Sequence, residues 1–208
     1  MLRIRSFILL LAAICLTGCS SVSTTHLLGE PIDDSTAEEF DGVWKAGDTL
    51  FMARHLGGGE FRVATSKWNE LEKKFEFEQN RLFVRSLGKA MIMQLPEGDE
   101  DSGDGGEEKA VQYSLARAIL TETDELILIP ADARRFAPAV QNGELKGEAF
   151  GAGAGEGVEG FAQGSATTVH LTGAKEEIDA FLTADRLLLF FNIEDGGVLR
   201  RVEEVKIE

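Results

Sequence analysis

The chain has 208 residues, and its 36 acidic and 21 basic side chains give a formal net charge of −15 at pH 7. A field of this sign repels phosphate backbones and anionic membrane surfaces, so the composition argues against direct binding of DNA or RNA. The two cysteines, Cys15 and Cys19, both lie at the amino terminus, so the rest of the chain has no thiol for a disulfide, a metal or a nucleophile.

The first nineteen residues have the layout of an export signal. Arg3 and Arg5 precede an apolar run over 7–16, which is about half of the ~20 residues that span a bilayer. The run ends in Leu16-Thr17-Gly18-Cys19, which resembles the lipobox of bacterial lipoproteins. This resemblance implies that residues 1–18 are a removed signal peptide and that Cys19 is the acylated first residue of the mature protein.

The residue after the acylated cysteine indicates a destination. Ser20 stands there instead of aspartate, which resembles the pattern of Gram-negative lipoproteins sent to the outer membrane. We therefore expect palmitate and other acyl chains on Cys19 to anchor the protein to the periplasmic face of the outer membrane. An ordinary secretory signal is the alternative. The mature chain would keep 19 basic residues against 36 acidic ones, a net charge of −17.

The composition changes near residue 40. Residues 19–39 are rich in serine, threonine and acidic side chains and predict a lipidated flexible tether, followed by a single β-rich globular domain over 40–208. Short segments with β periodicity follow one another in this domain and predict an antiparallel meander: 49–54, 60–68, 73–78, 81–87, 90–95, 111–120 and 125–129.

Two hairpin turns are expected within this meander. Gln79-Asn80 predicts a two-residue turn that places Phe77 opposite Leu82. The three glycines over 57–59, which follow His55-Leu56, predict the other turn.

Two short helices are expected near 132–142 and 174–183. The first follows Pro130 and contains Pro138, and the second has two glutamates in its first turn. The apolar run over 187–193 predicts a buried strand, and the alternation at Val205 and Ile207 predicts the last one. The fold class is therefore mainly β (α+β), a half-open barrel or curved sheet with two short helices.

A G-x-W triplet occurs in Phe40-Asp41-Gly42-Val43-Trp44 and resembles the motif of the lipocalins. The resemblance implies that Trp44 closes one end of an eight-stranded barrel beneath a basic residue from a late strand, either Arg200 or Arg201. The chain departs from the lipocalin pattern because two helices precede its last strands. An aromatic plug in another β domain is the alternative, and the mature region also resembles small bacterial exported proteins without an assigned activity.

No catalytic set or cofactor site is recognised. His55-Leu56-Gly57-Gly58-Gly59 is similar to the oxyanion stretch of some lipases, but no G-x-S-x-G nucleophile elbow accompanies it. The acidic segment 97–108 could attract calcium, yet its spacing favours a solvated loop. Gly151–Gly164 lacks the lysine of a phosphate-binding loop and is interpreted as a connector. His55 and His170 are too few for a zinc site without added carboxylates.

We expect a cell-envelope lipoprotein that binds a protein partner or an apolar ligand through its β domain and is not an enzyme. A hydrolase with an unrecognised carboxylate site is one alternative, and a passive structural or assembly factor of the envelope is another. A carrier of typical small molecules requires an apolar cavity above roughly 300 Å³. A hydrolase requires acids that converge in a cleft, and an assembly factor requires an exposed apolar patch.

Overall fold

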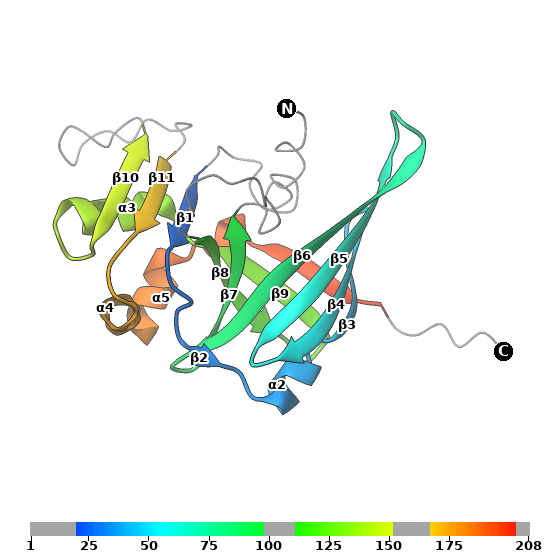
Figure 1. Cartoon of the computed structure of the whole chain (residues 1–208), viewed down its shortest axis with the longest axis horizontal. Helices are drawn as coiled ribbons and strands as arrows, with labels where there is room; N and C mark the ends of the chain where they lie inside the picture. Colours follow the sequence, from blue (N-terminus) through cyan, green and yellow to red (C-terminus); the bar gives the residue numbers. More distant parts are fainter. Residues whose placement is uncertain (1–19, 98–110, 152–166, 203–208) are drawn as a thin grey trace, which may run out of the picture.

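A computed structural model describes residues 20–97, 111–151 and 167–202 of the protein. Strands dominate these residues and pair into one twelve-stranded sheet (Figure 1). The elements follow in this order: β1 (Ser21–Thr24), β2 (Glu30–Pro31), α2 (Asp34–Glu38), β3 (Gly42–Ala46), β4 (Thr49–Gly57), β5 (Glu60–Asn69), β6 (Lys74–Leu87), β7 (Ala90–Glu97), β8 (Gln112–Leu120), β9 (Glu125–Pro130), α3 (Ala133–Gln141), β10 (Gly147–Gly151), β11 (Thr167–Leu171), α4 (Lys175–Phe181), α5 (Ala184–Phe190), the 3-10 turn η1 (Ile193–Asp195) and β12 (Gly197–Arg201).

Eight of the strands close into an antiparallel barrel. β3 to β8 each pair with the next strand of the chain, β9 pairs with β12, and β12 returns to β3. The mainly β fold and the antiparallel meander expected from the sequence are therefore confirmed, and the meander closes fully. An eight-stranded barrel has an interior just wide enough to be filled by side chains or to hold one small ligand.

The hairpin of β5 and β6 projects beyond the rest of the barrel (Figure 1). The turn expected at Gln79-Asn80 is wrong, because both residues lie inside β6 and pair with Ala64 and Val63 of β5. The chain turns instead after Asn69, whose side-chain Oδ1 accepts the backbone N–H groups of the second and third residues that follow it, at 2.9 and 3.0 Å. This side-chain turn ends the strand where the alternating pattern alone gives no signal.

The glycine turn between β4 and β5 is confirmed. Gly57, Gly58 and Gly59 have φ angles of 112°, 61° and 75°, which residues that carry a side chain rarely adopt. A Cβ atom on Gly59 would also collide with the carbonyl oxygen of Val84 on β6. The segment that resembles a lipase oxyanion stretch is therefore explained by the hairpin that it forms.

The segment over 20–39 belongs to the folded domain. β1 pairs in parallel with β11 and antiparallel with β8, and its Ser23 Oγ lies 2.6 Å from Nδ1 of His170. Leu28 is fully buried, and its backbone N–H donates to Oε1 of Gln94 at 2.7 Å. The flexible tether expected over 19–39 is thus wrong for the described residues, because the polar side chains that suggested a solvated segment have partners inside the fold.

A second lobe lies between β9 and β12. The helices expected near 132–142 and 174–183 are confirmed as α3 and α4, and Asp132 caps α3 by accepting the backbone N–H of Arg134 at 3.0 Å. The strand expected over 187–193 is wrong, because α5 and η1 occupy this run. Leu187 is buried whereas Leu188 and Leu189 are exposed, so one apolar run serves two different faces of a helix.

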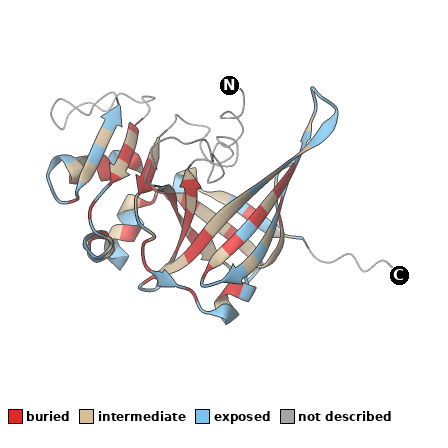
Figure 2. Cartoon of the chain, viewed as in Figure 1, coloured by how far each residue is buried: buried red, intermediate tan, exposed pale blue. Residues whose placement is uncertain are grey.

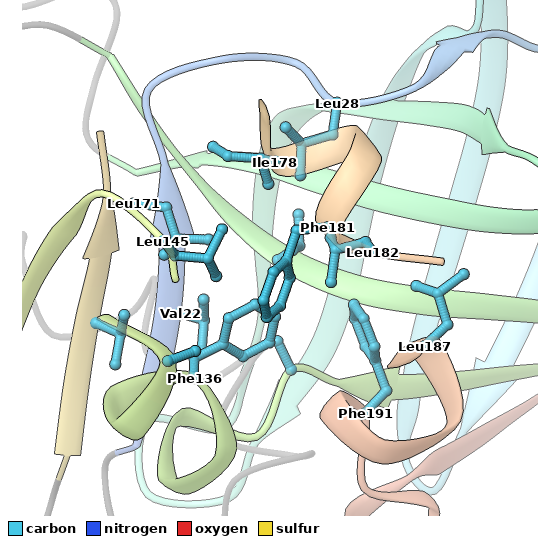
Figure 3. Packing of buried hydrophobic residues seen from close by; sticks show 14 of the residues in the cluster. Val22, Leu28, Phe136, Leu145, Leu171, Ile178, Phe181, Leu182, Leu187 and Phe191 are labelled. Atoms are coloured by element: carbon cyan, nitrogen blue, oxygen red, sulfur yellow. The ribbon is translucent and has the colours of Figure 1, made fainter. Parts of the chain in front are cut away.

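Two hydrophobic cores result from this arrangement, and Figure 2 shows both as bands of buried residues. One core fills the barrel. The other lies between the outer face of β7–β9 and the second lobe, where Val22 of β1, Phe136 of α3, Phe181 of α4 and Leu187 of α5 converge (Figure 3). The barrel is therefore covered on one side, and its β4–β6 side faces solvent.

Several segments considered in the sequence lie outside the described residues. These are the signal segment with Cys19, all but the first residue of 97–108 and of 151–164, and the positions of Val205 and Ile207. Within 20–97, 111–151 and 167–202, no helix has the length and apolar character needed to cross a membrane.

Candidate functional site

Aromatic side chains close one end of the barrel. Trp44 of β3 is only 2% exposed, and its Nε1 donates to the carbonyl oxygen of Phe40 at 3.0 Å. The guanidinium of Arg201 lies over the indole, with Cζ 4.4 Å from the ring centroid, where the ring face attracts a cation. The same guanidinium donates to the carbonyl oxygens of Asp41, at 2.8 Å, and Glu39.

The closed end formed by Trp44 and Arg201, which we call the floor, has the contacts implied by the G-x-W resemblance. Arg201 supplies the basic group, whereas Arg200 points outward and pairs with Glu125 at 3.0 Å. Gly42 has a φ of 131°, and a Cβ atom there would lie 2.9 Å from Nη1 of Arg201. The glycine and the tryptophan of the triplet therefore have separate physical roles, since one leaves room for the guanidinium and the other receives it.

An apolar cavity of about 120 Å³ lies above the floor, inside the barrel. Its walls consist of inward-facing side chains from the eight strands, among them Phe51, Phe61, Val63, Met93, Leu126 and Leu199. Alanines at other inward positions, Ala46, Ala53 and Ala116, leave the room that larger side chains would fill. The cavity is smaller than the roughly 300 Å³ of typical small-molecule pockets. It is close to an engineered apolar cavity of about 150 Å³ that binds benzene.

The cavity extends from the floor toward the opposite end of the barrel. Trp44 lines its lower part next to the floor, while Ala46 lies further along β3 and Leu199 and Gly197 lie further from the floor along β12. Because β3 and β5 both run from the floor to this end, it is also the end from which the β5–β6 hairpin projects. The cavity therefore has a sealed floor and faces the hairpin side.

The two histidines considered for a metal site are held apart on β4 and β11. The ring of His55 packs on Phe61 at 5.1 Å between centroids, and His170 contacts Ser23 and Phe150. In the part of the chain that the structure describes, no group of three or more histidine, cysteine, aspartate or glutamate side chains is placed to hold a metal ion.

The carboxyl groups with shifted pKa values lie at the surface. Hydrogen bonds from the Ser35 hydroxyl and from Thr36 lower the pKa of Asp33 to about 2, which suits its role as the N-cap of α2. A hydrogen bond from Lys175 lowers the pKa of Glu30, and one from Lys146 lowers that of Glu177. These groups belong to different elements and serve as a cap and as ion pairs, so they do not form an acid–base pair in a cleft.

The tip of the β5–β6 hairpin carries an exposed apolar patch, which we call the tip patch. It consists of Trp68, Leu71, Phe75 and Phe77. Leu71 is 96% exposed, and the rings of Trp68 and Phe75 meet edge to face at 5.0 Å. Figure 2 shows the whole tip as exposed. Such a patch on a projecting hairpin is typical of a contact surface.

No family model, curated protein or solved structure matches this chain. Its function is therefore inferred from the barrel and its surfaces. The G-x-W motif indicated Trp44 and either Arg200 or Arg201 at the floor, of which the structure has Arg201, but neither the cavity nor the tip patch was predicted from the sequence. The signal for the cavity was present as small residues at inward strand positions, but it becomes readable only when the register is known.

Proposed function

We propose that this protein is a lipid-anchored protein of the cell envelope whose barrel binds the apolar part of a small or slender ligand, such as the end of an alkyl chain. The observation that carries the ligand assignment is the apolar cavity, which has a floor sealed by Trp44 and Arg201 and walls made of carbon. Each methylene that leaves water for such a site contributes about 0.8 kcal/mol. The function is binding rather than catalysis.

The size of the cavity sets the class of ligand. About 120 Å³ does not hold a drug-sized molecule, so we propose that only the apolar end of an amphiphile enters the barrel. Its polar part would stay at the mouth, where Asn80 is the polar side chain that shares the inward face with its register partner Val63. The side-chain amide of Asn80 is uncharged and can hydrogen-bond to a neutral head group such as an alcohol.

We propose an acyl anchor on Cys19 because of the Leu16-Thr17-Gly18-Cys19 motif, and we propose the periplasmic face of the outer membrane as its location. Only Ser20 separates Cys19 from β1, and one residue spans at most about 3.6 Å. Acyl chains on Cys19 would therefore hold the start of β1 close to the bilayer. This position supports access of the barrel to amphiphiles that leave or enter the membrane.

Binding of n-octanol to the purified protein tests the ligand assignment. We expect stabilisation that rises with the logarithm of the free alkanol concentration above its Kd and reaches about 2.7 kcal/mol at 100 times the Kd, because only the folded barrel binds it. Ala53→Leu adds three carbon atoms inside the cavity and should abolish the effect. Thermal unfolding with increasing alkanol provides the measurement.

Ala64→Leu is the matched control for this experiment. Ala64 pairs with Met52 on β4, next to the Ala53–Val63 pair, and its side chain points to the outside of the barrel. The same three carbon atoms are therefore added outside the cavity, and octanol binding should stay at the wild-type level. If Ala53→Leu binds octanol as well as Ala64→Leu does, the cavity is not the binding site.

A second candidate function, docking of a protein partner of the envelope, is favoured by the tip patch. Leu71→Ser combined with Phe77→Ser should abolish recovery of the partner after cross-linking in the envelope, because the two changes remove most of the exposed apolar area of the tip. Octanol binding should be unchanged, since neither residue lines the cavity. Equal partner recovery from the wild type and the variant would rule out docking through the tip.

A further inference from the structure

A groove of about 670 Å³ lies on the second lobe, outside the barrel. Its walls come from the outer face of β8 and β9, the first turn of α3, the end of α5 and η1. It shares no lining residue with the barrel cavity. Its volume falls within the range of about 300–1,000 Å³ that is typical of small-molecule sites.

Three arginines line this groove although the chain as a whole is strongly acidic. Arg134 is neutralised, because its Nε donates to Asp132 at 2.9 Å and its Nη2 lies 3.7 Å from Asp195. Arg117 and Arg135 make no ion pair or hydrogen bond through their side chains in the described parts of the chain, and the Nε of Arg117 is buried. The groove therefore presents two guanidinium groups that have no counter-charge.

The remaining acidic residue in the groove does not cancel these two charges. Glu194 is exposed and lines the groove, while Asp132 is already paired with Arg134. Elsewhere on the surface, arginines such as Arg54 and Arg186 pair with carboxylates. A buried guanidinium nitrogen without an acceptor is unfavourable, and an anion in the groove would supply the acceptor.

Apolar side chains also line the groove. Leu188 is 66% exposed and Ile193 is 68% exposed, and Leu189 between them is also exposed. Ile129 and Phe191 line the same groove and are buried. A ligand with both an alkyl chain and an anionic group would therefore match the lining of the groove, because the chain would cover the apolar side chains and the anion would pair with the arginines.

We propose that this groove binds an amphipathic anion, a carboxylate or phosphate group attached to an alkyl chain. Arg117 and Arg135 bind the oxygens of the head group, because a guanidinium donates two parallel hydrogen bonds to a carboxylate or phosphate. The alkyl chain lies along Leu188, Leu189 and Ile193. This site is independent of the barrel cavity, and it requires the charged head group that the barrel does not.

Isothermal titration of the purified protein with laurate tests this proposal. Removing a charged hydrogen-bond donor should weaken binding by about tenfold or more, so Arg117→Gln and Arg135→Gln should each reduce the affinity by that factor. Arg62→Gln removes the same charge from an exposed position on β5, outside the groove, and should leave the affinity within about twofold of the wild type. Arg135 is exposed, so its variant remains informative if Arg117→Gln does not fold.

Further ligands distinguish the contribution of the head group from that of the alkyl chain, and a barrel variant distinguishes the groove from the barrel cavity. Dodecanol has the chain without the charge, and inorganic phosphate has the charge without the chain. In the Ala53→Leu variant, whose barrel cavity is filled and no longer takes up an alkanol, both should bind at least about tenfold more weakly than laurate or dodecyl phosphate. Laurate binding at the groove should persist in Ala53→Leu, because this change fills the barrel cavity and does not touch the groove. The proposal is overturned if Arg135→Gln binds laurate as the wild type does, if Ala53→Leu abolishes laurate binding, or if phosphate alone binds as tightly as dodecyl phosphate.

Discussion

We expect Trp44→Ala to lower the free energy of unfolding by about 3–5 kcal/mol, because a buried indole is replaced by a cavity next to an existing one. The change also removes the hydrogen bond to the carbonyl oxygen of Phe40 and the ring face that receives the guanidinium of Arg201. Urea denaturation followed by circular dichroism measures this loss without relying on tryptophan fluorescence.

Trp68→Ala provides the comparison, because it deletes the same side chain at the tip patch. Trp68 is partly exposed and contacts mainly Phe75, so its loss should cost far less, about 1 kcal/mol or below. Equal losses for the two variants would contradict the account of Trp44 as the floor of the barrel.

The largest expected effect on location comes from Cys19→Ser, which removes the thiol that we propose to be acylated. Attachment through acyl chains gains about 0.8 kcal/mol for each buried methylene, so a chain without them should leave the membrane fraction almost completely. Radiolabelled palmitate should enter the wild-type protein and not the variant.

Cys15→Ser is the matched control for this change, since Cys15 lies within the apolar run ahead of the proposed cleavage point. This variant should be labelled by palmitate and should remain with the membrane. Retention of Cys19→Ser in the membrane fraction would show that another feature of the chain holds the protein there.

Much of the barrel was predictable because each strand alternates between the core and the other face. Val63 and Phe61 point into the barrel while Ala64 points outward, and this period of two is visible in the sequence. The predictions that were wrong concern segments whose sequence pattern does not reveal where they lie in the fold. β6 continues through Gln79 and Asn80 without a turn, and the apolar run after Ala184 is helical because only one of its faces is buried.

The candidate sites were harder to predict than the fold. The floor could be predicted because Gly42 and Trp44 form a local motif whose partner, Arg201, lies at the end of β12. The groove could not, since Arg117 comes from β8, Arg135 from α3 and Leu188 from α5. Residues this far apart in the chain meet only after the second lobe folds onto the barrel, and no spacing rule brings them together.

Fluorescence quenching of Trp44 by a brominated alkanol tests the central claim most directly. Trp68→Phe leaves Trp44 as the single tryptophan, and Trp44 lines the cavity. A bromine atom quenches an indole that it contacts, so 8-bromooctan-1-ol in the barrel should quench Trp44 in a saturable manner, and the added Ala53→Leu change should abolish this saturation. Quenching that rises linearly with concentration and is the same with and without Ala53→Leu would contradict binding of an apolar ligand inside the barrel.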